Sequence, residues 1–414
     1  MNQTSGDSAP PRSSPRIYLA VDNCFAYKRW TAPAEWASLI RDLGARCIEA
    51  SADTEADPLY NGPEYMAAWR TEVRLAAARS GVRVVNLYSG HGTYTTLGLG
   101  HPDARVRERM KELWFKPMVE AAADLGAGLG FFAHAFPDSV LQNPARYREA
   151  RERLLDSLAE IALFGARRGV RSMGVEQMYA PHQIPWTIEG AREVLREVHA
   201  RSGVPFYLTI DTGHSVGQHS FAMPGLEELR KAAASGGRER VPPEQWLGAD
   251  TTLRRFEDLL RQDDEATRER GLAGVVEDMQ AHHYLFSSSR DGDPYEWLAA
   301  LGAYSPIVHL QQVTGSSSAH EPFTPECNAR GSIHPRRVLE AIAASYAAAA
   351  DPALPPRCTS LYLTLEIFAG SGVLPRVLLE QLRVSVEYWR RWIPVDGQPL
   401  AALLAGRAEG EANP

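Results

Sequence analysis

The stretch Leu208-Thr-Ile-Asp211-Thr-Gly-His214 is a short apolar run that ends in an aspartate, with a histidine three residues later. Three further apolar runs also end in a side chain that can bind a metal ion: Gly-Val-Glu176, Ile-Val-His309 and Leu-Thr-Leu-Glu366. Carboxylate oxygens and an imidazole nitrogen together suit a divalent cation. If each run is a strand, this order predicts one metal centre at the mouth of a barrel.

Short apolar runs alternate with longer segments of helical spacing along the chain. The runs lie at 17–21, 47–50, 82–87, 128–132, 172–175, 206–210, 307–310 and 361–365. Most are continuous rather than alternating, which is typical of parallel strands covered on both faces. Amphipathic segments between them lie at 33–43, 63–80, 105–125, 143–168, 188–200 and 335–349. Eight strands alternating with helices favour an α/β fold of the closed (β/α)8 TIM-barrel type over an open doubly wound sheet.

The chain has 414 residues, which leaves room for additions to a barrel of about 250 residues. We predict disordered tails at 1–15 and 396–414, a barrel at 16–395 and a helical insertion at about 222–270, after strand six. The crossover helix of strand six is then expected at 272–286. Because the insertion leaves the carboxyl end of a strand, it lies on the face where barrels keep their active sites, as a lid or an oligomer contact.

Composition limits the partners that the chain can have. The net charge of -7 argues against a polyanionic partner, so we expect no nucleic acid. The four cysteines are far apart and form no Cys-x-x-Cys pair, which indicates reduced thiols in the cytoplasm. No apolar run approaches the length of a membrane span, and no signal peptide precedes the first strand. We therefore expect a cytoplasmic protein without a membrane partner.

The strand ends carry the predicted chemistry. All strands of a parallel barrel end at the same rim, so residues that are far apart in the sequence can meet there. We expect Glu176, Asp211, His309 and Glu366, at the ends of strands five to eight, to surround one cation. Water or substrate oxygens would fill the remaining coordination positions.

The motifs Val-Glu176, Ile-Asp211-Thr-Gly-His214, Val-His309-Leu-Gln-Gln and Leu-Glu366 resemble those of the xylose-isomerase-like TIM-barrel superfamily, over roughly Arg16 to Trp392. Its members include ketose 3-epimerases, sugar isomerases, inosose dehydratases and, more distantly, endonuclease IV. The resemblance implies that the four residues bind one divalent ion, with Mn²⁺ first and Co²⁺, Mg²⁺ or Zn²⁺ as alternatives. It also implies that Glu176 and Glu366 form an acid/base pair and that His214 contacts substrate oxygens.

This ligand set suits the removal of a proton next to a carbonyl group, because a metal ion stabilises the resulting enediolate. A carboxylate on each face of the substrate would give epimerisation, and proton return to the neighbouring carbon would give isomerisation. We expect a metal-dependent sugar isomerase or epimerase of carbohydrate metabolism, acting on a small sugar or keto-cyclitol as a dimer or tetramer. A dehydratase or other lyase acting on an inosose or keto-sugar shares the first step and stays an alternative.

Two departures from the ketose 3-epimerases leave the substrate open. Those enzymes carry a glutamate where this chain has His182, and an arginine where it has Gly315. Further residues near the rim are expected to bind substrate: Glu49, His91, His134, His182, His214, Gln311 and Arg330.

His91 and His134 also suggest a remote alternative, a phosphoesterase of the endonuclease IV type. In that branch, histidines after strands three and four help to bind a metal cluster. It also needs an Asp-x-His pair on strand seven, but here His309 is followed by Leu310, Gln311 and Gln312. The acidic charge balance provides no obvious phosphate-binding surface.

Overall fold

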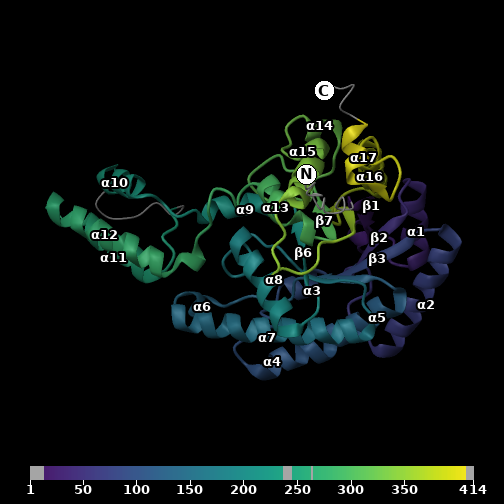
Figure 1. Cartoon of the computed structure of the whole chain (residues 1–414), viewed down its shortest axis with the longest axis horizontal. Coiled ribbons are helices and arrows are strands. Elements are labelled where there is room, and N and C mark those ends of the chain that lie inside the picture. Colours follow the sequence, from purple (N-terminus) through teal and green to yellow (C-terminus); the bar gives the residue numbers. More distant parts are fainter. Residues whose placement is uncertain (1–13, 236–244, 263, 407–414) are drawn as a thin grey trace, which may run out of the picture.

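The computed structural model describes residues 14–235, 245–262 and 264–406, and its centre is a closed parallel barrel (Figure 1). Neighbouring strands pair in sequence order, and β1 pairs with both β2 and β8, which closes the ring. The (β/α)8 prediction is confirmed. The barrel strands are β1 (Arg16–Asp22), β2 (Cys47–Ser51), β3 (Arg83–Tyr88), β4 (Gly128–Phe131), β5 (Met173–Glu176), β6 (Tyr207–Asp211), β7 (Ile307–Leu310) and β8 (Ser360–Leu365).

Helices surround the barrel, and local sequence signals set many of their ends. Proline occupies the first helical position of several helices, where its missing N–H costs nothing. Left-handed glycines end four helices, at positions that favour a residue without Cβ. The main outer helices are α1 (Pro33–Asp42), α2 (Pro63–Ser80), α4 (Ala104–Met110), α5 (Lys116–Leu125), α7 (Pro144–Arg168), α8 (Ile188–Ser202), α13 (Pro294–Leu301), α15 (Pro335–Ala347) and α16 (Pro375–Arg390). A π-helical segment, η2 (Lys111–Phe115), joins α4 to α5.

The barrel interior changes from apolar to acidic along its axis. A small buried cluster fills one level of the interior, and it includes Ala20, Cys47 and Ile307. Successive side chains of a strand point to opposite faces, so residues two positions further along point inward again. Those residues are Asp22, Glu49 and His309. The alternation of the strands therefore directs a layer of ionisable side chains to the carboxyl end of the barrel.

Helices α10 (Leu226–Ser235), α11 (Asp250–Leu260) and α12 (Glu265–Ala281) form an arm between β6 and β7 that projects from the barrel (Figure 1). Our expectation that 272–286 holds the crossover helix of strand six is wrong, because α12 packs against α10 and α11. Gly271 and Gly274 allow α12 to approach Leu259 and Arg255 of α11 closely. The helix that contacts β6 and lies beside α8 and α15 is α13.

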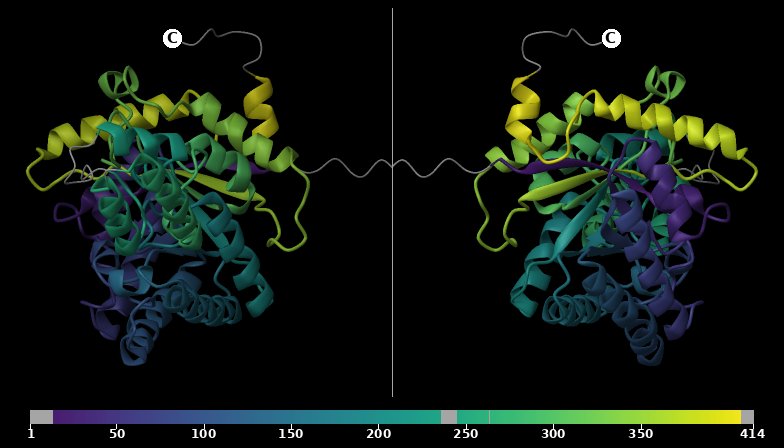
Figure 2. Two further views of the ribbon diagram at one scale, coloured as in Figure 1. Left: turned by 90° about the vertical axis from the view of Figure 1, so that its left-hand side faces the viewer. Right: turned by 90° about the vertical axis from the view of Figure 1, so that its right-hand side faces the viewer.

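The chain beyond Asp396 is folded up to Gly406, which corrects our expectation of disorder there. Strand β9 (Gln398–Pro399) pairs antiparallel with β1, and α17 (Leu400–Ala405) follows it, as Figure 2 shows beside the start of β1. The carboxylate of Asp396 accepts hydrogen bonds from the Leu19 N–H and from Arg390. The predicted tails at 1–13 and 407–414 lie outside the described residues. Within the described ranges, every helix is too short or too polar to cross a lipid bilayer.

Candidate metal centre

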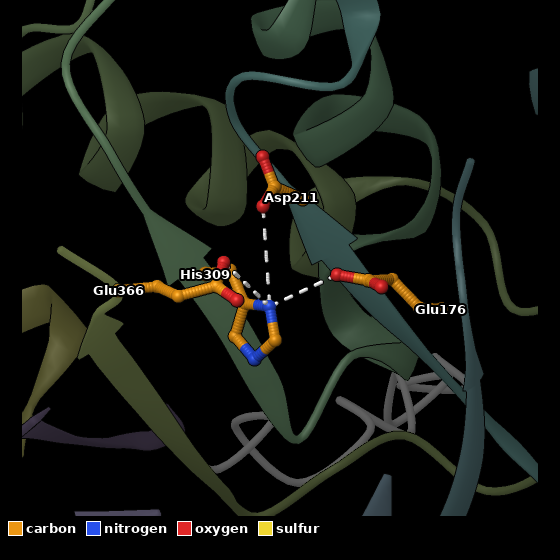
Figure 3. Close-up of side chains that lie close together, drawn as sticks. All are labelled: Glu176, Asp211, His309 and Glu366. Atoms are coloured by element: carbon orange, nitrogen blue, oxygen red, sulfur yellow. Dashed lines mark hydrogen bonds and ion pairs between the residues drawn. The ribbon is translucent and has the colours of Figure 1, made fainter. Parts of the chain in front are cut away.

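Glu176, Asp211, His309 and Glu366 meet at the carboxyl ends of β5 to β8 (Figure 3). Their potential ligand atoms all lie within 4.8 Å of one another. Nδ1 of His309 is 3.0 Å from Oε1 of Glu176, 3.2 Å from Oε2 of Glu366 and 3.9 Å from Oδ2 of Asp211. Figure 3 shows the two glutamates reaching the His309 ring from opposite sides.

Strand register brings these residues together. Asp211 is the direct neighbour of His309 in the pairing of β6 with β7. Glu176 is the last residue of β5, and Glu366 follows β8, where its N–H donates to the carbonyl of Leu310. Parallel strands in this register present their final inward side chains at one level of the barrel.

The cluster holds more carboxylates than its neighbours can neutralise. In the part of the chain that the structure describes, the ion-pair partners of these three acids are histidines: His214, His309 and His320. Nδ1 of His309 can donate one hydrogen at most, yet three carboxylates surround it. Oε2 of Glu366 is buried and accepts no hydrogen bond from a described residue. Because buried like charges are costly without a counter-charge, this donor set fits a divalent cation.

Electrostatic interactions keep both glutamates ionised. Burial raises the pKa of the Glu366 carboxyl, but His309 and His320 outweigh this effect and hold the pKa well below its usual value. Burial also raises the pKa of Glu176, and His214 and His309 lower it further than burial raises it. Burial lowers the pKa of His320, yet Glu366 and other acids bring it to about 9.

A further pair of carboxylates lies on the other side of the His309 ring. Oε2 of Glu49 is 2.9 Å from Nε2 of His309, and Oε1 of Glu49 accepts a hydrogen bond from Asn86 at 2.6 Å. Burial and the charge of Glu49 raise the pKa of Asp22 well above its usual value. A metal-binding histidine usually donates its second N–H to such a carboxylate, which leaves the other nitrogen free for the ion.

A cavity of about 580 Å³ opens above the cluster. This volume lies within the range of about 300–1,000 Å³ that is usual for small-molecule sites. Glu366 lines the cavity, as do the side chains of three histidines and several hydroxyl-bearing residues. The named members of this lining are Ser51, Tyr88, Ser89, His91, Tyr94, Thr95, Tyr179, His214, Ser316, Ser317, Ser318 and His320.

The residues that we expected to bind substrate take different places. His91 and His214 line the cavity. Gln311 is buried, and its Nε2 donates to both oxygens of Asp211, at 2.9 and 3.0 Å. Glu49 is buried, and its Oε2 lies 2.9 Å from Nε2 of His309. The remaining three, which do not line this cavity, are His134, His182 and Arg330.

Two of these histidines have other contacts. His134 is buried, and its Nε2 contacts the carbonyl of Ile184. His182 is exposed, and its Nδ1 lies 2.8 Å from the carbonyl oxygen of Phe136. The two possible metal-binding groups found among the described residues include neither His91 nor His134, the two histidines on which the phosphoesterase alternative rests.

Sequence reasoning missed Tyr88 and Tyr94 as site residues. Both hydroxyls donate to Oε2 of Glu176, and the two hydroxyl oxygens lie 2.7 Å apart. Burial and the charge of Glu176 raise the pKa of both tyrosines well above the usual value, so both stay protonated. The available signal was the position of Tyr88 directly after the predicted third strand, at the rim where the other site residues lie.

Comparison with known proteins agrees with this geometry. The sequence model of the family described as xylose isomerase-like TIM barrel matches residues 37–238, a range that includes Glu176 and Asp211. Over this range, about half of the chain, the sequence is similar to the xylose isomerase-like TIM-barrel family. The chain is also similar to the D-erythrulose 1-phosphate 3-epimerase of Brucella abortus, to which it is 25% identical over 273 residues. The match spans 65% of this chain and 65% of the relative's length.

Solved structures show the same fold. A putative xylose isomerase from Rhodospirillum rubrum superposes with a TM-score of 0.64 at 18% identity, over 91% of this chain and 99% of the other. The D-allulose 3-epimerase from Methylomonas sp., in complex with D-allulose, superposes with a TM-score of 0.52 at 13% identity, over 92% and 98% of the two chains. At these identities, the likeness supports the barrel architecture rather than a substrate.

Proposed function

We propose that this protein is a divalent-metal-dependent sugar epimerase or isomerase that transfers a proton next to a carbonyl group. The observation that carries the proposal is the placement of two ionised glutamates, Glu176 and Glu366, on opposite sides of His309 in a buried acidic cluster below a cavity. The chain is similar to a protein named D-erythrulose 1-phosphate 3-epimerase. This similarity supports epimerisation rather than elimination as the reaction of this protein.

Glu176, Asp211, His309 and Glu366 would hold the metal ion, for which Mn²⁺ is our first candidate. When bound, a divalent cation supplies a Lewis acid that stabilises negative charge on substrate oxygens. Gln311 orients Asp211, and Glu49 accepts from Nε2 of His309, so that Nδ1 faces the cluster. These outer contacts set the direction of the ligand atoms before any ion or substrate arrives.

The protein's own groups would then bind and move protons. Glu366 lines the cavity and would remove the proton from the substrate carbon. In the form of the enzyme that carries a proton on Glu176, return of that proton to the opposite face would invert the configuration at that carbon. His214 and His320, which also line the cavity, would donate hydrogen bonds to substrate oxygens.

Deuterium incorporation from heavy water tests this proposal, because it reports proton removal whatever the product. The probes are D-erythrulose 1-phosphate, D-fructose, xylose and a keto-cyclitol, with Mn²⁺ added. Glu366→Gln and Glu176→Gln should each lower exchange by about 100-fold or more, since general acid–base catalysis contributes about that much. Chelation should abolish exchange, and added Mn²⁺ should restore it.

Glu340→Gln is the matched control, because Glu340 lies on α15 and pairs with Arg336 at the surface. Normal exchange in a metal-stripped sample, or in both glutamine variants, would refute the proposal. Loss of water from a probe, seen as a new unsaturated or deoxy product, would instead assign the dehydratase reaction.

A further inference from the structure

Both carboxylate oxygens of Glu176 already have partners in the protein. Oε1 lies 3.0 Å from Nδ1 of His309. Oε2 accepts hydrogen bonds from the hydroxyl groups of Tyr88 and Tyr94. Glu366 differs, because its Oε2 has only ion-pair contacts, with Nδ1 of His309 at 3.2 Å and Nδ1 of His320 at 3.5 Å, and accepts no hydroxyl hydrogen bond from a described residue. The two glutamates of the cluster are therefore not equivalent.

The two glutamates also differ in their access to the cavity. Glu366 lines the cavity, whereas Glu176 is fully buried and does not. The two tyrosines that hydrogen-bond to the Glu176 carboxylate are among the residues that line the cavity. Tyr88 is buried, and Tyr94 is half-buried. A substrate in the cavity would thus reach the Glu366 carboxylate directly, but would reach Glu176 only through a tyrosine hydroxyl.

The surrounding structure fixes both tyrosine rings. Tyr88 ends β3, and its ring packs edge-on against His309 with 4.8 Å between centroids. Tyr94 ends α3 (His91–Tyr94), and its ring lies 5.5 Å from that of Phe132.

Asp53 holds the short helix α3, which ends at Tyr94. The Asp53 carboxylate accepts from the His91 N–H at 2.8 Å, and a Cβ on Gly90 would lie 2.8 Å from the Asp53 backbone nitrogen. The Tyr94 hydroxyl is thus held in place before substrate binds.

We propose that the Tyr94 hydroxyl exchanges a proton with the substrate on the side opposite Glu366. Glu176 accepts or supplies that proton through its hydrogen bond with Tyr94, and we call this two-residue path the relay. This inference rests on the proposed function and assigns a catalytic contact that the four-residue cluster alone does not provide. Tyr88 is a positioning residue, because its hydroxyl holds the same oxygen of Glu176 from deeper in the barrel.

The relay conserves protons and charge. When the substrate carbon loses its proton on this side, that proton passes to the Tyr94 oxygen while the hydroxyl proton of Tyr94 moves to Oε2 of Glu176. In the reverse direction, the cycle starts with Glu366 ionised and Glu176 protonated. Glu366 takes the proton of the substrate carbon, Glu176 passes its proton to the Tyr94 oxygen, and the hydroxyl proton of Tyr94 forms the new C–H bond. Tyr94 is neutral before and after each step, and one of the two glutamates gains a proton as the other loses one.

Tyr94→Phe tests the relay, because it removes only the hydroxyl. The probes are two pairs of C-3 epimers, D-fructose with D-allulose and D-erythrulose 1-phosphate with L-erythrulose 1-phosphate, in heavy water with Mn²⁺. Wild-type protein should exchange the C-3 hydrogen of both members of a pair. Tyr94→Phe should keep exchange in the epimer whose hydrogen faces Glu366. Exchange in the other epimer, and epimerisation, should fall by about 100-fold or more.

Two further variants sharpen the test. Tyr88→Phe should show a smaller loss, because the Tyr94 hydroxyl still reaches both Glu176 and the cavity. Tyr65→Phe, a partly exposed tyrosine on α2, should match the wild type. Mn²⁺ affinity, measured by calorimetry, should fall no further in Tyr94→Phe than in Tyr88→Phe, because each variant removes one hydrogen bond to Oε2 of Glu176.

The outcomes separate the relay from the proposed function. Equal losses for both epimers, together with weaker Mn²⁺ binding than in Tyr88→Phe, would show that Tyr94 only positions Glu176 and would overturn the relay. Normal epimerisation by Tyr94→Phe beside an inactive Glu176→Gln would overturn the relay and leave the proposed function standing. A wild-type protein that exchanges none of these probes would overturn both.

Discussion

The His309 ring lies between two sets of buried carboxylates and has one nitrogen directed at each. Glu49 is 2.9 Å from Nε2, and Glu176 and Glu366 lie within 3.2 Å of Nδ1. When Nε2 donates to Glu49, Nδ1 is the nitrogen that can bind the proposed ion together with Glu176 and Glu366. The orientation of a single imidazole thus depends on a glutamate on the opposite side of the barrel.

His134 provides a test of buried charge that is separate from catalysis. Burial lowers its pKa to about 4, so the folded protein keeps this imidazole neutral, whereas the unfolded chain protonates it near pH 6.5. Stability therefore falls as the pH drops from about 6.5 towards 4, because the unfolded state binds the proton more tightly. Between pH 7 and pH 5, the free energy of unfolding should fall by about 2 kcal/mol more in the wild type than in His134→Gln.

Urea unfolding of both proteins at pH 7 and pH 5 measures this difference. His283→Gln is the control, since His283 is exposed and its replacement should leave the wild-type pH dependence unchanged. If His134→Gln loses as much stability between pH 7 and pH 5 as the wild type does, His134 is not the group that causes this loss.

At the scale of elements, the contact between α7 and β5 supports the strand that carries Glu176. Gly165 of α7 faces Met173, the first residue of β5, and a Cβ on Gly165 would lie 1.9 Å from the Met173 sulfur. The absence of a side chain on Gly165 lets the helix lie close to the strand. The position of Glu176 therefore depends on a glycine eleven residues earlier.

Gly165→Val should separate α7 from β5 and lower the free energy of unfolding by about 1–3 kcal/mol, the usual cost of overpacking. It should also weaken Mn²⁺ binding, because Glu176 moves with β5. Ala166→Val is the matched control, since Ala166 is exposed on the same helix. Thermal unfolding and calorimetry measure both effects, and an unchanged Gly165→Val protein would show that this close contact is not required.

At the scale of the whole molecule, the C-terminal segment joins the two ends of the described chain. The Leu400 N–H donates to the carbonyl of Pro15, and the Ala401 N–H donates to the Ser14 hydroxyl. Leu400 and Leu403 are buried. The segment after Asp396 therefore belongs to the folded barrel rather than to a tail.

Leu400→Ala should lower the free energy of unfolding by about 2–5 kcal/mol, the usual cost of emptying a buried leucine site. Ala402→Ser, at an exposed position of α17, should have little effect. Denaturant unfolding compares the two, and equal midpoints would mean that α17 contributes little to the barrel.

The barrel and its four-residue cluster could be predicted from local patterns. Continuous apolar runs indicate strands buried on both faces, and parallel strands share a rim, so residues that close four successive runs must converge. Asp211 and His309 illustrate this, because each lies at or next to the end of its strand and they are direct neighbours in the pairing of β6 with β7. The helical pattern at 272–286 misled us, because helical periodicity does not reveal which neighbour a helix packs against.

The sequence alone determined the strand order, the rim and the residue types that meet there, because these depend on local periodicity and on a property common to all parallel barrels. Only the tertiary structure decided which carboxylate faces the cavity. Tyr88 and Tyr94 cover Glu176, and Glu366 stays open, because the register between neighbouring strands and the turn held by Asp53 place the two hydroxyls there. No local pattern records such contacts, since they join residues that are 38 to 88 positions apart.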